Sequence, residues 1–158
     1  MNTPDAPSTV VDARIVRADE GESISAAGVA HLFKLTGQDT GGLLGMEEFV
    51  LPPGTVGARL HIHRAHDEYF YVLSGRLTVT TGSGDHVLEP GDLAHAPRGS
   101  IHGYRNDDAS VEVRALCLYT PPGYEQYFRD VHDAVAAGEE LTVDLLADLR
   151  SRYETESL

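Results

Sequence analysis

The sequence predicts an all-β fold, a sandwich or barrel of short strands that ends in short C-terminal α-helices. Between about residues 27 and 120 the chain is a series of short runs rich in β-branched and aromatic residues, separated by Gly, Pro and Asp. Such runs are typical of strands joined by turns, and many of them in succession favour a sandwich or barrel. After Pro121 and Pro122 the apolar residues change from strand-like to helical spacing.

The strand-like runs fill the middle of the chain. They begin with AHLFKLT near residues 30–36 and GMEEFVL near 45–51, continue with RLHIH, EYFYVL, RLTVT, HVLE, DLAHA and IHGYRN, and finish with VEVRALCLY at Tyr119. We therefore divide the chain into an N-terminal arm (1–26), a barrel (27–120) and a helical extension (121–158). The first dozen residues show little periodicity, which indicates a mobile arm.

Two helices are predicted after the barrel. Gly138 stands where the C-terminal cap of the first helix belongs, and Thr142 can cap the second. We expect these helices to cover a barrel edge or to pack against a second subunit. Their apolar positions are Tyr124, Tyr127, Phe128, Val131 and Val135 in the first, and Leu146, Leu149 and Tyr153 in the second.

The composition limits the function classes. The 158 residues suit one domain, and 25 acidic against 12 basic residues give a formal net charge of -13. This charge repels nucleic acids and anionic membranes, and Lys34 is the only lysine. A chain of this length needs neither a disulfide nor a structural metal to form a core, so we expect any bound metal to serve chemistry.

The same composition bears on location and assembly. The single Cys117 allows no intramolecular disulfide, and the N-terminal segment has no basic stretch followed by an apolar run. We therefore expect a soluble cytoplasmic protein. We also expect a homodimer, because the strand edges, the N-terminal arm and the apolar helical stripes all offer surfaces to a partner.

Six of the eight histidines fall between residues 61 and 102. His61 and His63 are two apart in a strand-like run, so both imidazoles would point to one face. Glu68 would open the next strand on a mostly apolar face, where an ionised carboxylate is costly unless it is paired or metal-bound. With His102 at the start of a later strand, three imidazoles and a carboxylate would converge, a donor set that suits a divalent transition metal and leaves one or two coordination positions open.

Two motifs in this region resemble those of the cupins. HIHRAHDEYFYVLSG at 61–75 matches the first cupin motif, in which HxH is followed by a Glu five residues on and a Gly seven further; GDLAHAPRGSIHGYRN at 91–106 matches the second. The leading Gly of the first motif departs by one or two positions, at Gly54 or Gly57, which affects a loop and not the ligands. The wider context is similar to single-domain cupins related to quercetin dioxygenase.

The resemblance implies a double-stranded β-helix, a jelly-roll-like barrel of two facing sheets with one metal ion near its wider mouth. The ion is a divalent transition metal, and Fe, Mn, Ni, Cu and Zn all suit such ligands. The ligands carried over from the motifs are His61, His63, Glu68 and His102.

The remaining histidines are expected outside this ligand set. His66 lies in the turn between ligands, where a solvated loop histidine is the common outcome. His95 alternates with Ala94 and Ala96 and should face outward. Surface positions are expected for His31, His86 and His132.

Candidate substrate-binding residues surround the ligands. Tyr104 shares the face of His102, so its phenol would lie near the metal, although core packing explains it equally well. Phe49 and Phe70 are expected as apolar walls of the cavity, with core packing an equal account of Phe49. Ala94 and Ala96 stand where cupins usually carry larger aliphatic residues, which leaves room for an aromatic ligand unless a neighbour fills the space.

These features favour a metal-dependent enzyme that acts on a small hydroxylated aromatic or polyketide-like substrate, with a dioxygenase as the favoured activity. Glu68 and Tyr104 are the candidate catalytic residues, Glu68 as the acceptor of the proton from the substrate's oxygen. The alternatives are a non-oxidative metal-dependent cyclase or isomerase and a non-catalytic cupin that binds a small molecule.

Overall fold

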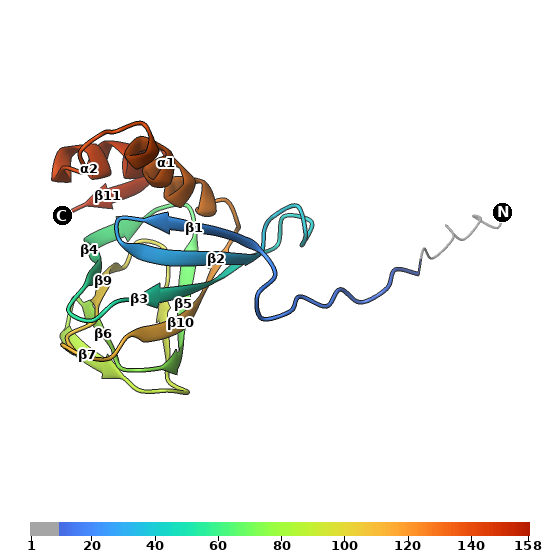
Figure 1. Cartoon of the computed structure of the whole chain (residues 1–158), viewed down its shortest axis with the longest axis horizontal. Helices are drawn as coiled ribbons and strands as arrows, with labels where there is room; N and C mark the ends of the chain where they lie inside the picture. The colour runs from blue at the N-terminus through green and yellow to red at the C-terminus, as the bar shows by residue number, and fades with distance from the viewer. Residues whose placement is uncertain (1–9) are drawn as a thin grey trace.

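The computed structural model describes residues 10–158 of the chain. Two antiparallel sheets face each other as a barrel, and two helices lie over one end of it (Figure 1). The six-stranded sheet has the order β1 (Glu22–Ala26), β2 (Val29–Leu35), β3 (Gly45–Leu51), β10 (Val113–Thr120), β5 (Asp67–Ser74) and β8 (Leu93–Ala96). The five-stranded sheet has the order β11 (Thr155–Ser157), β4 (Val56–His63), β9 (Ile101–Arg105), β6 (Leu77–Thr81) and β7 (Gly84–Leu88). The predicted all-β barrel, a double-stranded β-helix, is confirmed.

Alternation along the strands builds the core between the sheets. In β10 every second residue, from Val113 to Tyr119, is buried, and β3 repeats the pattern, because side chains of a strand point to its two faces in turn. Phe49 and Phe70 are buried in this core with their ring centres 6.4 Å apart and edge to face. The barrel interior at this level is therefore filled by packed side chains.

Strand register brings distant parts of the chain to one place. In the pairing of β4 with β9, His61 lies opposite His102. In the pairing of β4 with β11, His63 lies opposite Thr155. The register thus places two of the predicted ligands side by side and adds a residue from the last strand.

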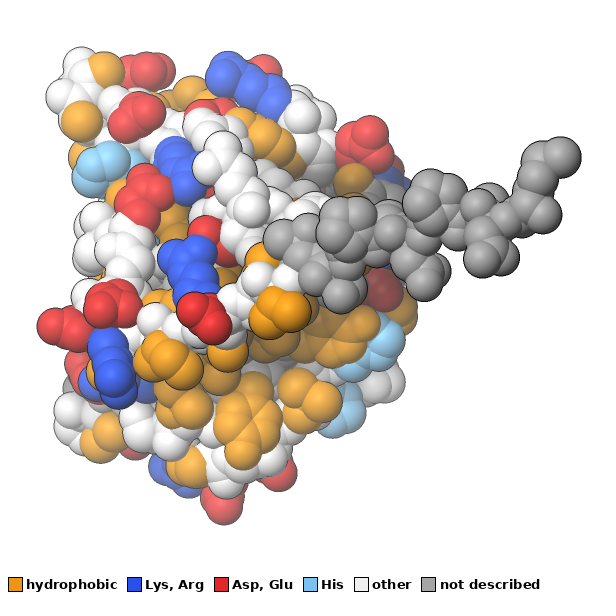
Figure 2. Space-filling model, turned by 90° about the vertical axis from the view of Figure 1, so that its right-hand side faces the viewer, with side chains coloured by type: hydrophobic (Ala, Val, Ile, Leu, Met, Phe, Trp, Pro, Cys, Tyr) orange, Lys and Arg blue, Asp and Glu red, His pale blue; other side chains and the backbone are white. Residues whose placement is uncertain are grey.

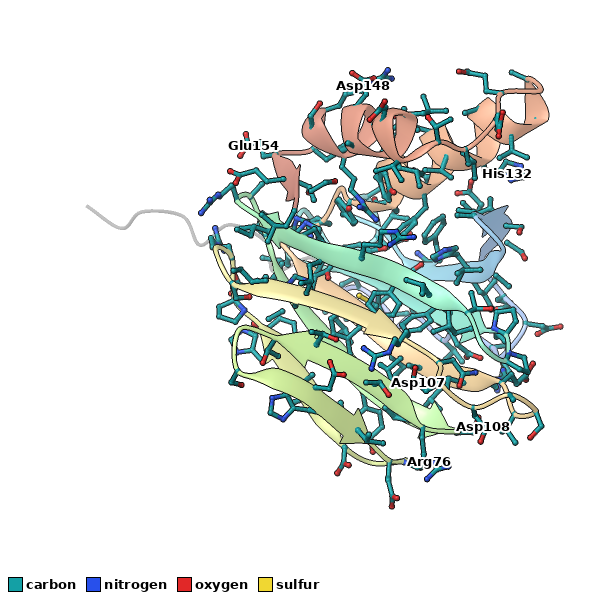
Figure 3. All side chains as sticks on the ribbon, turned by 90° about the vertical axis from the view of Figure 1, so that its left-hand side faces the viewer. Arg76, Asp107, Asp108, His132, Asp148 and Glu154 are labelled. Carbon is teal, nitrogen blue, oxygen red and sulfur yellow. The ribbon has the colours of Figure 1, made fainter. Side chains whose placement is uncertain are left out.

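The helices α1 (Glu125–Ala136) and α2 (Val143–Ser151) cover the barrel end. They bury Val131 of α1 and Leu149 of α2 in the main core, so the apolar stripes pack against the barrel of the same chain. The hydroxyl of Thr142 accepts a hydrogen bond from the backbone N–H of Leu145, as expected of an N-cap. Figure 3 shows this end, with His132 and Asp148, opposite the end that carries Arg76 and Asp107.

Two short strands differ from the expected boundaries. Residues 22–26, which we assigned to the arm, form β1 and pair with β2; their small and polar residues lack a strand-like run. Residues 155–157 form β11 inside the expected helical extension, and three residues are too few to show alternation. Of the predicted mobile arm, residues 1–9 lie outside the described residues. Among the described residues, no helix has the length and apolar character that a membrane crossing requires.

Candidate metal centre

Four side chains from three strands meet at one point inside the barrel. They are His61 and His63 of β4, Glu68 of β5 and His102 of β9, and their ligand atoms all lie within 4.8 Å of one another. Nε2 of His63 lies 3.2 Å from Oε1 of Glu68, and Nε2 of His102 lies 3.0 Å from Oε2. All four residues are at most 4% exposed. Three imidazole nitrogens and a carboxylate in this arrangement fit a divalent transition metal.

In each of the three histidines, Nδ1 is the ring nitrogen that faces away from the shared point, and it lies beside an oxygen atom. Nδ1 of His61 donates to the carbonyl of Arg59 at 2.7 Å, and Nδ1 of His102 lies 3.4 Å from the carbonyl of Ser100. Nδ1 of His63 lies 2.7 Å from the hydroxyl of Thr155, which itself donates to a backbone carbonyl. These contacts place the ring proton on Nδ1, so each Nε2 presents its lone pair to the shared point.

Burial and neighbouring charge set protonation states suitable for metal binding. Burial, together with the nearby imidazoles, lowers the pKa of His61 to about 3, and burial also lowers the pKa of His63. Burial alone would raise the pKa of Glu68, but the surrounding imidazoles, that of His63 foremost, hold it well below its usual range. A neutral imidazole and an ionised carboxylate are the forms that coordinate metal ions.

His66 is buried, and the expectation of a solvated loop histidine is wrong. It is 4% exposed, and its Nε2 lies 3.3 Å from Oε1 of Glu68. Its ring centre lies 4.1 Å from that of His63 and 4.7 Å from that of Tyr124. The imidazole therefore orients the carboxylate of Glu68, and it stands outside the group of four donors.

A narrow cavity adjoins His61 and Glu68. Its volume is about 30 Å³, which is room for one or two water molecules. Strands supply one side of the cavity and side chains of α1 and α2 supply the other, so a ligand larger than water would require these helical side chains to move. Besides the two donors, its lining includes His31, Tyr104, Tyr124, Tyr127, Phe128 and Arg150.

The predicted substrate-binding residues divide between the core and two pockets. Tyr104 lines the narrow cavity, its ring 5.3 Å from that of Phe49, and burial raises the pKa of its phenol well above the usual range. Phe70, Ala94 and Ala96 line a wider pocket of about 450 Å³ that reaches His102. Phe49 is fully buried and packs in the core.

His31 was expected at the surface, and the structure corrects this. It is 2% exposed, and its Nδ1 lies 2.8 Å from Oε2 of Glu47, which is 1% exposed. Burial raises the pKa of Glu47, and His31 opposes the shift. A signal was present in the sequence: with period two, His31 shares the buried face of Val29 and Phe33.

The other histidines lie away from the four donors. His95 is exposed as expected, and its ring stacks on Tyr69 at 4.6 Å. His86 is exposed on β7. His132 is partly exposed, and its Nδ1 donates to the carbonyl of Ser25 at 2.9 Å.

The comparison with protein families agrees with this geometry. The family model for the cupin domain matches residues 47–119, a range from β3 to β10 that includes all four donors. Residues 47–119 of this chain are therefore similar to the cupin domain.

Known proteins of several activities resemble the chain at low identity. Quercetin 2,3-dioxygenase of Bacillus subtilis (strain 168) is 28% identical over 123 residues, which cover 75% of this chain and 34% of that protein; the chain thus spans about a third of its length. A sugar phosphate isomerase structure from Silicibacter pomeroyi has a TM-score of 0.60 at 24% identity, covering 68% of this chain and 75% of that one. A polyketide cyclase structure from Streptomyces resistomycificus has a TM-score of 0.57 at 20% identity, covering 70% and 80%. The two structures show a shared fold.

Thr155→Val should weaken metal binding by this protein about 10-fold to 100-fold, the usual cost of losing a group that orients a metal ligand. The valine removes the oxygen that accepts from Nδ1 of His63 and keeps the side-chain volume. Competition with a chelator measures the affinity. Thr155→Ser keeps the hydroxyl and should bind like the parent; equal affinities of the Val and Ser variants would contradict the role.

Acid should destabilise the metal-free protein from about pH 6.5 downward. The His61 imidazole has a usual pKa of 6.5 and a folded pKa of about 3. Between these values the unfolded chain binds more protons, so the free energy of unfolding falls as pH falls, by up to about 5 kcal/mol from this residue. The lowered pKa of Glu68 has the same sign and acts below its usual value of 4.5.

Urea unfolding at a series of pH values measures this dependence. His61→Gln removes the titrating imidazole, so its profile should be flatter over the same range. A parent profile that is flat between about pH 6.5 and 4 would contradict the protonation states described above.

Proposed function

We propose that this protein is a metal-dependent enzyme that acts on a small hydroxylated aromatic or polyketide-like substrate, with dioxygenase activity favoured. The observation that carries the proposal is the convergence of His61, His63, Glu68 and His102 beside a cavity lined by aromatic side chains. Four protein donors leave one or two positions of a five- or six-coordinate ion for substrate. The likeness to quercetin 2,3-dioxygenase supports the oxidative reaction.

In the proposed reaction, the metal-binding residues and their neighbours have distinct roles. A divalent metal held by the four donors would lower the pKa of an enol or phenol oxygen of the substrate. Glu68, kept ionised by its neighbours, accepts that proton, a contribution typically worth about 100-fold to 10,000-fold. His66 keeps the Glu68 carboxylate in position through its hydrogen bond. Tyr104, kept protonated by burial, donates a hydrogen bond to a substrate oxygen.

A non-oxidative cyclase or isomerase is the second candidate. The observation that favours it is Tyr104, because a buried, protonated phenol beside the ligands can polarise a carbonyl without any dioxygen. Zinc would suffice for this reaction, since it needs a Lewis acid and no change of oxidation state.

Oxygen uptake separates these reactions. The protein is loaded in turn with Fe, Mn, Ni, Cu or Zn, quercetin serves as the probe substrate, and an oxygen electrode and mass spectrometry follow the reaction. We expect dioxygen consumption in step with loss of quercetin. Glu68→Gln should lower kcat/KM by at least about 100-fold, whereas His86→Gln, an exposed site, should match the parent. Conversion without oxygen uptake would indicate the second candidate, and binding without conversion a non-catalytic cupin; both would overturn the dioxygenase.

We also propose that the chain forms a homodimer through the outer face of its six-stranded sheet. Figure 2 shows hydrophobic side chains gathered on this side of the molecule. On adjacent strands, Tyr71 is paired with Leu93, and they are 40% and 59% exposed; Leu73 is 41% exposed. Apolar patches of this kind mark association surfaces, and a two-fold dimer pairs such a patch with itself.

Light scattering at micromolar concentration should therefore give twice the mass of a single chain. Leu93→Lys should shift the mass toward the monomer, because it buries a charge in the contact. The matched control Val87→Lys lies at an exposed position of β7 in the other sheet and should remain dimeric. A monomeric parent protein would rule the dimer out.

A further inference from the structure

Arg150 is a buried cation on the wall of the narrow cavity. It belongs to α2, is 9% exposed, and lines the same cavity as His61 and Glu68. Its Nε has no hydrogen-bond partner among the described residues, and its Nη1 donates to the hydroxyl of Ser157 at 3.3 Å. Its guanidinium carbon lies 5.7 Å from the ring centre of Tyr127. The side chain also hydrogen-bonds the phenol of Tyr127, so the donor capacity that remains unused at the cavity is that of Nε.

Comparison with the other arginines shows that a buried arginine without an acidic partner is unusual in this chain. With Lys34 as the single lysine, the 12 basic residues include 11 arginines, all of which lie within residues 10–158. Eight of them form ion pairs with Asp or Glu. Of the remaining three, Arg17 and Arg59 are exposed, and Arg150 is buried.

A buried guanidinium without a counter-charge costs free energy, because burial removes its hydration and no anion replaces it. The chain has 25 acidic residues, so the lack of an ion pair at Arg150 does not follow from a shortage of carboxylates. A ligand anion would supply the missing charge and satisfy the unused donor at Nε. Because Arg150, His61 and Glu68 line one narrow cavity, a single small molecule could reach both the guanidinium and these donors once the side chains of α1 and α2 that line the cavity move aside.

We propose that Arg150 binds a carboxylate group of the substrate, which makes the substrate class a small hydroxylated aromatic acid. The proposal rests on the proposed function, since it names the substrate of the same site. A planar carboxylate accepts two parallel hydrogen bonds from the fork of a guanidinium. The remainder of the lining, with Tyr127, Phe128 and Val131, is aromatic and aliphatic, which suits the ring of such an acid and a single negative charge.

A pair of probes that differ only in charge tests this. Binding of 2-hydroxybenzoate and of its neutral analogue 2-hydroxybenzamide is measured by calorimetry on the full chain loaded with Zn, so no turnover is needed. Charge-assisted hydrogen bonds predict that the parent binds the acid about tenfold or more tightly than the amide. Arg150→Met keeps the stem of the side chain and should remove this preference, mostly by weakening the acid. The matched control Arg152→Met, at an exposed arginine paired with Asp148, should keep the preference.

Three results would overturn the proposal. An acid preference that survives in Arg150→Met would show that another group holds the carboxylate. An equal loss for acid and amide, with a lower Tm of the ligand-free variant, would give Arg150 a packing role. Displacement of 2-hydroxybenzoate by inorganic phosphate at a lower concentration than by acetate, dependent on Arg150, would assign the site to phosphate. Arg150→Lys, which keeps the charge, should retain part of the preference and checks that the fold is intact.

The outcome is independent of the reaction catalysed. An Arg150-dependent acid preference without oxygen uptake would leave the substrate class standing and reject the dioxygenase. Oxygen uptake with neutral aromatics, unaffected by Arg150→Met, would support the dioxygenase and reject the aromatic acid as the substrate class.

Discussion

His63→Ala should abolish stoichiometric binding of a divalent metal and leave most of the fold intact. The substitution removes one of the four converging donors. In the parent protein, Nε2 of His63 lies 2.9 Å from Nε2 of His61 and 3.2 Å from Oε1 of Glu68. The barrel remains because its core is apolar and lies between the sheets. Elemental analysis of the purified protein measures the metal content, and circular dichroism measures the fold.

The matched control is His86→Ala. His86 is also a histidine on a strand of the five-stranded sheet, but it is exposed and outside the four donors. Its metal content should equal that of the parent. A normal metal content in His63→Ala would show that the ligands have been assigned wrongly.

Glu47→Ala should lower the free energy of unfolding by about 1–3 kcal/mol, the cost of leaving a buried hydrogen-bonding group without its partner. Glu47 and His31 are 1% and 2% exposed and lie 2.8 Å apart. The substitution leaves Nδ1 of His31 without its acceptor in a place with little access to water. Urea unfolding of the metal-free protein measures the change.

Two variants locate the origin of this loss. Glu48→Ala changes the next residue of the same strand, whose side chain points outward and pairs with Arg114 at the surface, and should cost no more than about 1 kcal/mol. Replacing both His31 and Glu47 with Leu removes the unpaired groups together and should recover much of the stability. A Glu47→Ala variant as stable as Glu48→Ala would show that the pair contributes little.

The four donors were predictable because each lies in a local pattern. His61 and His63 lie on one face of their strand because side chains alternate with a period of two. Glu68 and His102 lie near the beginnings of strands that follow recognisable turn residues. Convergence then follows from closing the strands into a barrel. The same reasoning placed His95 outside and identified the cap of the second helix.

Thr155 and Arg150 carried no such pattern. Thr155 reaches His63 through the pairing of β11 with β4 across 92 residues, and a three-residue strand has no periodicity to detect. Arg150 lies near the end of a short helix, followed by the polar Ser151 and Arg152, where a charged side chain is normally solvated. Its burial depends on how α2 packs over the barrel, which is a tertiary property.

The pairing of β11 with β4 also bears on the order in which contacts form during folding. Contacts between residues far apart along a chain form late, because closing a long loop loses entropy before any contact compensates for it. We therefore expect Nδ1 of His63 to gain its hydroxyl partner on Thr155 late in folding. A metal ion would then be bound tightly only after β11 has paired with β4, and a partly folded chain would lose the ion to competing chelators.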